Sequence, residues 1–243
     1  MSLTSGYSLR RWWLQSSREL LAQAMNHEPV SAGPAATSLA QRLWNSNSDL
    51  ARSCLEHPFV QGLALGHLPR QHFCSYVAQD ASFLESFARA YALAIAHSPD
   101  RASLIAFNTL LQGVLEELGL HAGYASRWQI NLAEVTPLPA TEAYTTFLWE
   151  TAQAGDVGLI CAAMTPCLRL YAWLGQQLRI QVGEPDHAYG DWIRTYAHPD
   201  FEALARHLET LLNRHAPAAA PVAATYRRAM ELELVFFDAH RPG

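Results

Sequence analysis

Apolar residues in this chain recur at steps of three and four, and this helical period decides which folds are open to it. Between residues 73 and 91 the chain has no strand-like alternation, and its large apolar side chains would share one helix face: Phe73, Tyr76, Val77, Phe83, Leu84, Phe87 and Tyr91. The sequence also contains no Asn-Gly or Asp-Gly hairpin turn. We therefore predict an all-α fold in which the helices pack as one bundle-like domain.

Prolines that follow a capping residue mark where several of these helices should begin. We interpret Ser98-Pro99-Asp100, Leu68-Pro69 and His198-Pro199 as helix starts. The predicted helices cover residues 8–25, 38–56, 69–97, 100–119, 140–154, 156–182, 186–196, 199–215 and 222–240. Because residues 26–37 form a linker with two prolines and a glycine, we divide the chain into an N-terminal extension (1–37) and a helical domain (38–243).

The basic residues exclude several classes of chemistry. All 17 are arginines, so the chain has no lysine for a pyridoxal phosphate aldimine, a Schiff-base aldolase or a P-loop. A net charge of −5 argues against nucleic acid as the main partner. The motifs G-x-G-x-x-G, G-x-S-x-G and H-E-x-x-H are also absent.

Targeting signals are weak. Uninterrupted apolar runs are short, as in Tyr91 to Ala96, whereas a membrane span needs about 18 residues. Arg10-Arg11 resembles a twin-arginine signal, but polar residues between Gln15 and Glu19 interrupt the apolar region that should follow. No C-x-x-C motif or disulfide framework occurs among the cysteines, so we expect reduced thiols in a cytoplasmic protein without a membrane contact.

Two carboxylates interrupt apolar helix faces. Asp80 lies one turn after Tyr76, and if buried it must be hydrogen-bonded or paired; otherwise it is an aspartate at the surface or rim. Glu233 shares a helix face with Phe236 and Phe237. Burial among aromatic rings would raise its pKa and suit it to proton transfer near neutral pH, unless this face is a solvated helix edge.

Cys167 is the candidate nucleophile among the cysteines. Pro166 cannot donate a backbone hydrogen bond, so the helix should either restart or kink there. If Thr165 caps a restarted helix, Cys167 lies in its first turn, where backbone amides favour the thiolate, and Tyr171 follows one turn later. The alternative is a small apolar cysteine of the core.

Glu117 and His121 lie at positions i and i+4 of one predicted helix. This spacing can bind a metal, as it does in carboxylate-bridged di-iron proteins. More often such a pair stabilises the end of a helix.

Taken in order, these segments resemble the TenA family, also called thiaminase II, over about residues 39–239. The resemblance rests on Leu55-Glu-His-Pro-Phe-Val-Gln-Gly-Leu63, Tyr76-x-x-Gln79-Asp80, Tyr144, Pro166-Cys167-x-x-x-Tyr171, Trp192-Ile-x-x-Tyr196 and Glu233-x-x-Phe236-Phe237. It implies a heme-oxygenase-like helical bundle, a homotetramer and no cofactor. It also implies hydrolysis of thiamin, or of the aminomethyl-pyrimidine left by its breakdown, to hydroxymethylpyrimidine for thiamin salvage.

The resemblance also implies a role for each candidate residue. Asp80 should bind the amine and a ring nitrogen of the pyrimidine, Cys167 should add to the ring, and Glu233 should transfer protons and help to activate water. The substrate-binding set comprises Asp80, Phe83, Tyr144, Tyr171, Tyr196 and Phe236. Many relatives have tyrosine at the position of Phe83, so this chain lacks one hydroxyl group.

Two other functions are compatible with the same fold. One is a heme-oxygenase-like oxygenase that binds a metal through Glu117 and His121. The other is a non-catalytic regulatory protein that binds pyrimidines.

Overall fold

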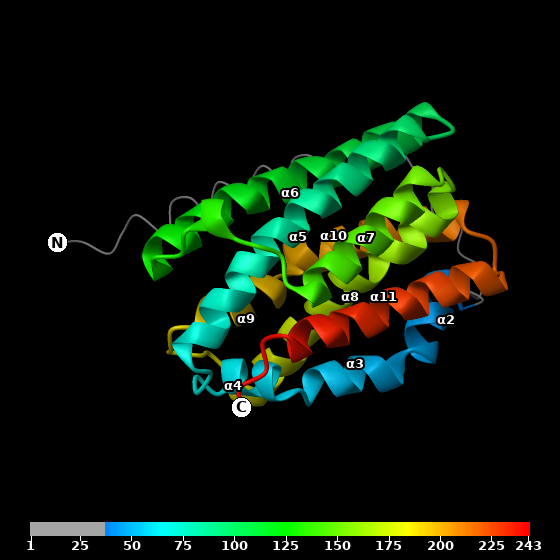
Figure 1. The fold of residues 1–243 in the computed structure, drawn as a ribbon. Helices are drawn as coiled ribbons and strands as arrows, with labels where there is room; N and C mark the ends of the chain where they lie inside the picture. Colours follow the sequence, from blue (N-terminus) through cyan, green and yellow to red (C-terminus); the bar gives the residue numbers. More distant parts are fainter. Residues whose placement is uncertain (1–36) are drawn as a thin grey trace.

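The computed structural model describes residues 37–243, apart from the side chains of residues 120, 121 and 124. Within this part there is no strand, and the all-α prediction is confirmed (Figure 1). The elements are α2 (Leu39–Ser46), α3 (Ser48–Leu55), α4 (Pro58–Ala64), α5 (Arg70–Ala96), α6 (Arg101–Trp128), η1 (Leu132–Glu134), α7 (Pro139–Gln153), α8 (Val157–Val182), α9 (Gly190–Tyr196), α10 (Pro199–His215) and α11 (Ala220–Asp238). The predicted helix at residues 8–25 lies outside the described residues, so the proposed domain division stays a prediction.

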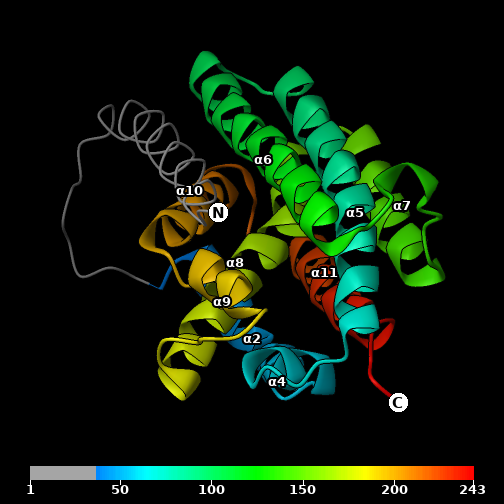
Figure 2. The same ribbon diagram turned by 90° about the vertical axis from the view of Figure 1, so that its left-hand side faces the viewer.

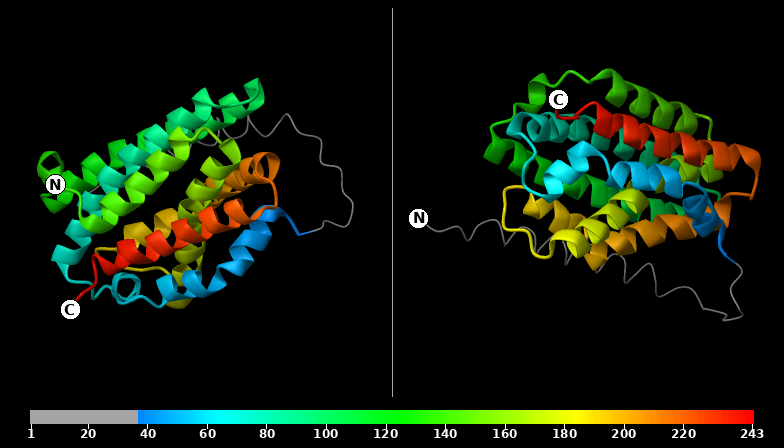
Figure 3. Two further views of the ribbon diagram at one scale, coloured as in Figure 1. Left: turned by 45° about the vertical axis from the view of Figure 1, so that its right-hand side comes forward. Right: turned by 90° about the horizontal axis from the view of Figure 1, so that it is seen from below.

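Helix α8 forms the centre of the bundle. It packs against α10 on one side and α11 on the other (Figure 2). The long helices α5 and α6 run side by side and form a second layer, in which α5 also contacts α7 (Figure 1). Helix α3 packs against α11 on the side that faces away from α5 and α6 (Figure 3). The helices that carry the candidate residues, α5, α8 and α11, therefore meet in the interior.

The central position of α8 explains its apolar sequence. By length and composition alone this helix could cross a membrane, because an 18-residue window of it has a mean hydropathy of 1.5. However, 72% of that window is buried against the other helices. This burial is typical of the core helix of a globular domain.

The structure corrects two predictions near the start of the described region. The single helix predicted at 38–56 is divided at Asn47, whose side chain donates to the carbonyl of Leu43 (2.8 Å) and ends α2. Helix α4 was not predicted. It begins where His57 Nδ1 accepts from the backbone N–H of Phe59 (3.2 Å), with Pro58 in the first turn.

Further along the chain, several helix boundaries differ from the prediction. The cap of α6 is Asp100 rather than Ser98, because the Asp100 carboxylate accepts from the N–H of Ser103 (2.8 Å). The same helix continues past the predicted end at 119 to Trp128. Helix α9 begins at Gly190 rather than 186, and α11 begins at Ala220 rather than 222.

A close approach between α8 and α9 depends on Gly175. A Cβ atom at this position would lie 2.3 Å from the carbonyl carbon of Tyr196, so a larger residue would force the two helices apart. The contact brings Tyr196 against Tyr171, with ring centroids 4.9 Å apart. Packing of the two helices thus determines how two of the predicted substrate-binding rings lie.

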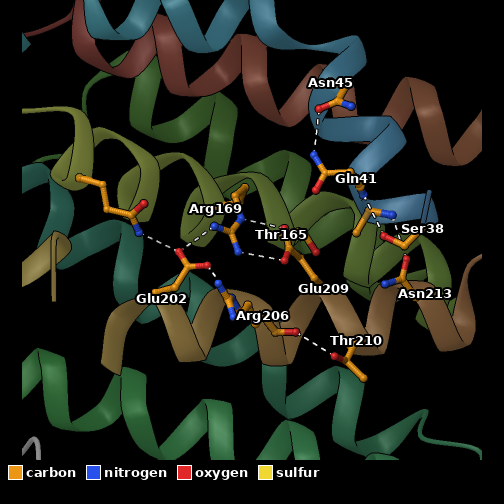
Figure 4. Close-up of polar contacts among 12 residues, drawn as sticks. Ser38, Gln41, Asn45, Thr165, Arg169, Glu202, Arg206, Glu209, Thr210 and Asn213 are labelled. Carbon is orange, nitrogen blue, oxygen red and sulfur yellow. Dashed lines mark hydrogen bonds and ion pairs between the residues drawn. The ribbon is translucent and has the colours of Figure 1, made fainter. Parts of the chain in front are cut away.

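Arg169 joins α8 to α10 through two carboxylates (Figure 4). Its Nε donates to Glu209 (2.7 Å) and its Nη1 to Glu202 (2.8 Å). The Arg169 side chain is 12% exposed, so these ion pairs are largely shielded from water. Because Arg169 is two residues from Cys167, these ion pairs also hold the part of α8 near the candidate site against α10.

Arg169→Met should lower the free energy of unfolding by about 3 kcal/mol, because it leaves the largely buried Glu209 without its cation. Arg206 pairs with the same Glu202 but is 74% exposed, so Arg206→Met is the matched control and should cost less than about 1 kcal/mol. Urea unfolding of both variants measures the difference. Equal losses would show that the Arg169 ion pairs do not stabilise the α8–α10 contact.

Candidate active site

Asp80, Cys167 and Glu233 come from three helices and lie together in the interior of the bundle. Asp80 on α5 and Cys167 on α8 line the same small cavity. Glu233 on α11 is only 2% exposed and is close enough to Cys167 for each group to influence the pKa of the other. The three side chains are distant in the sequence, so the packing of the helices is what brings them together.

The cavity between these helices has a volume of about 30 Å³. A water molecule needs roughly 10–15 Å³ on the same measure, so there is space for one or two waters but not for a pyrimidine ring. Side chains around the cavity must therefore move when a ring enters. The lining side chains are Asp80, Phe83, Leu84, Phe87, Val114, Glu117, Cys167, Leu168, Tyr171, Tyr196 and Phe201.

The charge of the cavity wall is negative. Asp80 and Glu117 both line it, and no arginine or histidine does so among the described residues. Opposite charges stabilise one another most strongly where water is excluded. Such a cavity favours a ligand that presents hydrogen-bond donors or a positive charge.

The carboxyl group of Glu233 has a strongly raised pKa. Burial raises the pKa to about 8, and the neighbouring charge of Asp80 acts in the same direction. Hydrogen bonds to the carboxylate oppose this shift; Tyr144 donates to Glu233 Oε1 at 2.7 Å. A carboxyl group that titrates near pH 8 can both accept and donate a proton under physiological conditions.

The thiol of Cys167 is not activated in the way that the sequence suggested. Helix α8 runs without interruption through Pro166, and the Thr165 hydroxyl donates back to the carbonyl of Cys161 (2.7 Å) instead of capping a new helix. Cys167 therefore has no helix N-terminus beside it, and that prediction was wrong. Burial raises the pKa of the Cys167 thiol well above its usual value, as do the charges of Glu233, Asp80 and Glu117.

The remaining predicted substrate-binding residues form two aromatic groups around these side chains. Phe83 packs against Tyr144 (4.7 Å between ring centroids) and Phe236 (6.2 Å), on the side where Glu233 lies. Tyr171 and Tyr196 line the cavity on the side of α8 and α9. Phe83 lines the cavity as well, whereas Tyr144 and Phe236 lie behind it.

Glu117 lies in the wall of the cavity. Its carboxylate accepts from the hydroxyl of Tyr196 at 3.5 Å, and the side chain of His121 lies outside the described ones. Across the described part of the chain, no group of three or more His, Cys, Asp or Glu side chains is placed to hold a metal. The sequence analysis did not predict that Glu117 lines this cavity. Its position three residues after the apolar Val114, on the same face of α6, was a signal that could have indicated it.

A second, more open cleft of about 780 Å³ lies between the start of α5 and the end of α6. Its lining includes Arg70, Cys74 and Trp128 but no carboxylate. Because no acid or base faces Cys74 there, the smaller interior cavity is the better candidate for chemistry.

Comparison with known proteins gives a consistent family match. The model of the TENA/THI-4/PQQC family matches residues 44–241. An aminopyrimidine aminohydrolase of Halalkalibacterium halodurans is 32% identical over 209 residues, covering 84% of this chain and 91% of the relative. The crystal structure of a TenA family transcription regulator from Silicibacter sp. TM1040 aligns with a TM-score of 0.77 at 29% identity, covering 83% of this chain and 96% of that one.

Some relatives are much longer proteins. The mitochondrial bifunctional TH2 protein of Arabidopsis thaliana is 31% identical over 228 residues, which are 83% of this chain but only 37% of the relative. A multifunctional thiamine biosynthesis protein, ThiED, of Corynebacterium efficiens is similarly matched over 30% of its length. The chain thus spans about a third of these multifunctional relatives.

Proposed function

Because the chain belongs to the TENA/THI-4/PQQC family, we propose that it is an aminopyrimidine hydrolase of thiamin salvage. Its substrates are the aminomethyl-pyrimidine from thiamin breakdown, or thiamin itself, and its product is hydroxymethylpyrimidine. The observation that carries this proposal is the placement of the buried Glu233 beside Cys167, next to the cavity that Asp80 lines. The name of the Halalkalibacterium relative, which matches over most of both chains, supports the same reaction.

Substrate recognition begins at Asp80. Its carboxylate is 7% exposed and faces the cavity, where it can only accept hydrogen bonds. The exocyclic amine of an aminopyrimidine can donate a hydrogen bond to this carboxylate. Stacking against Phe83 and the other aromatic side chains then holds the flat ring in place.

Covalent addition starts at Cys167, beside which the Glu233 carboxyl group lies. The Glu233 carboxylate takes the proton from the thiol while the sulfur bonds to a ring carbon. The displaced electron pair moves to a ring nitrogen, which accepts the proton that Glu233 now carries. A base is required because the pKa of the Cys167 thiol is raised, and Glu233 is the group in contact with it.

The added ring expels its leaving group more easily than an aromatic ring does. The electron pair on the added ring expels the amine from the methylene carbon, and the amine takes up the proton that the ring nitrogen releases and leaves as ammonia. Water then bonds to the methylene carbon and loses a proton to Glu233. The sulfur departs as the aromatic ring is restored, and it takes this proton back from Glu233. The net reaction is amine plus water to alcohol plus ammonia, with Cys167 and Glu233 regenerated.

Steady-state hydrolysis of aminomethyl-pyrimidine and of thiamin by the purified protein tests this function. We expect turnover of at least one of them, and turnover of neither would contradict the proposal. Metal analysis of the same protein separates it from the oxygenase alternative. The homotetramer and the cytoplasmic location stay predictions.

Asp80→Asn should weaken the binding of hydroxymethylpyrimidine about 5- to 150-fold. The amide keeps the size of the carboxylate but turns a donor toward the amine of the ligand, and an unsatisfied buried donor costs about 1–3 kcal/mol. Isothermal calorimetry measures this affinity. Glu233→Gln is the matched control and should bind the product nearly as well as the wild-type protein; wild-type affinity in Asp80→Asn would mean that Asp80 does not bind the ring.

A further inference from the structure

Behind Tyr171, a chain of hydrogen bonds connects three buried aromatic side chains. The indole Nε1 of Trp192 on α9 lies 3.3 Å from the hydroxyl of Tyr76 on α5. The Tyr76 hydroxyl in turn lies 3.1 Å from the hydroxyl of Tyr171 on α8. All three side chains are nearly inaccessible to water, with Tyr76 only 1% exposed.

The chemistry of these three groups determines which of them donates in each hydrogen bond. An indole N–H can only donate, so Tyr76 must accept from Trp192. The Tyr76 hydroxyl still has one proton, and the Tyr171 oxygen is the acceptor within its reach among the described residues. Tyr76 therefore donates to Tyr171, and the proton of Tyr171 points away from Tyr76.

The Tyr171 hydroxyl proton is thus available to a ligand. Tyr171 lines the interior cavity, whereas Tyr76 and Trp192 do not. Within residues 37–243, no described side chain accepts a hydrogen bond from the Tyr171 hydroxyl. Burial raises the pKa of Tyr171 well above its usual value, so the group keeps its proton at any physiological pH.

We propose that Trp192 and Tyr76 are positioning residues, which make the Tyr171 hydroxyl an obligatory donor to a ring nitrogen of the substrate. This inference rests on the proposed function and extends it to substrate choice. An aminopyrimidine has a lone pair on the ring nitrogen that Asp80 does not engage. A hydrogen bond to this nitrogen strengthens as the sulfur adds and electron density moves onto the ring, so the bond accelerates addition more than it aids binding.

A double-mutant cycle on the hydrolysis of aminomethyl-pyrimidine tests the proposal. We expect Tyr76→Phe and Tyr171→Phe each to lower kcat/KM about tenfold, mostly through kcat. Because Tyr76 acts through Tyr171, Tyr76→Phe should cause no further loss in the Tyr171→Phe background. Trp192→Phe should show the same dependence on the Tyr171 hydroxyl, with a smaller effect.

Tyr226→Phe is the control for removing a buried phenol hydroxyl, since Tyr226 is fully buried and its hydroxyl has no hydrogen-bond partner among the described residues. It should leave kcat/KM unchanged. Independent losses that multiply in the Tyr76/Tyr171 double variant would overturn the positioning role, because a structural effect of Tyr76 does not need the Tyr171 hydroxyl. That outcome would leave the proposed function intact, whereas absence of wild-type turnover would overturn both.

Discussion

Cys167→Ser should lower kcat for aminopyrimidine hydrolysis by about a thousandfold or more, while the protein remains folded. Serine nearly matches cysteine in size, but an alcohol is much less acidic than a thiol. Glu233, with a pKa of about 8, can take a proton from the neighbouring thiol during addition. The same group is far too weak a base to generate an alkoxide, so the covalent step should fail.

The control for this variant is Cys161→Ala on the same helix. Cys161 is fully buried, and its neighbours include none of the carboxylates of the cavity. We expect this variant to lose some stability through the smaller side chain and to keep most of its kcat. Steady-state kinetics and circular dichroism of both variants provide the comparison. If Cys167→Ser kept a large part of the wild-type rate, hydrolysis would proceed without a covalent intermediate.

The sequence pattern was sufficient to predict the helices because most of them have a buried face of the expected period. It was also sufficient to select Asp80 and Glu233, since a carboxylate on an apolar face is conspicuous. The distances between them could not be predicted, because they depend on how α5, α8 and α11 pack. The close approach at Gly175 is an example of a contact that no local pattern reveals.

The errors of prediction have physical causes. Pro166 was expected to restart or kink α8. The helix does not restart there, because the Thr165 hydroxyl bonds to the carbonyl of Cys161 within the same helix instead of capping a new one. The end of α6 was placed too early, because glycines at 119 and 123 are usually helix stop signals. Glu117 was considered only with His121, since spacing along one helix says nothing about a tyrosine on α9.

Glu233→Gln should make the protein more stable, and the gain should grow as the pH rises. The pKa of Glu233 is about 8 in the folded protein and 4.5 in the unfolded chain, so the folded state binds this proton more tightly. The stability that this proton contributes is fully present below pH 4.5 and is lost as the pH rises to about 8. A difference of one pKa unit corresponds to about 1.36 kcal/mol, so the difference between 4.5 and about 8 lowers the free energy of unfolding by up to about 5 kcal/mol.

Urea unfolding at pH 5 and pH 8 measures this effect. Glutamine does not titrate, so the variant should be several kcal/mol more stable than the wild-type protein at pH 8 and nearly equal at pH 5. Glu231→Gln is the matched control on the same helix; its side chain is 41% exposed, and its stability should follow the wild-type pH dependence. If the free energy of unfolding changed with pH by the same amount in Glu233→Gln and in the wild-type protein, Glu233 would not be held protonated by burial.

The same substitution should lower kcat about a hundredfold or more, because glutamine cannot carry a proton between the thiol, the ring and water. A residue that weakens the fold at the pH at which the protein works is hard to explain by packing alone. Functional sites often retain such groups because the raised pKa is what the reaction requires. A Glu233→Gln protein that is more stable and inactive would therefore identify the buried carboxyl as a group kept for proton transfer. If it were more stable and still active, proton transfer would have to be assigned to another group.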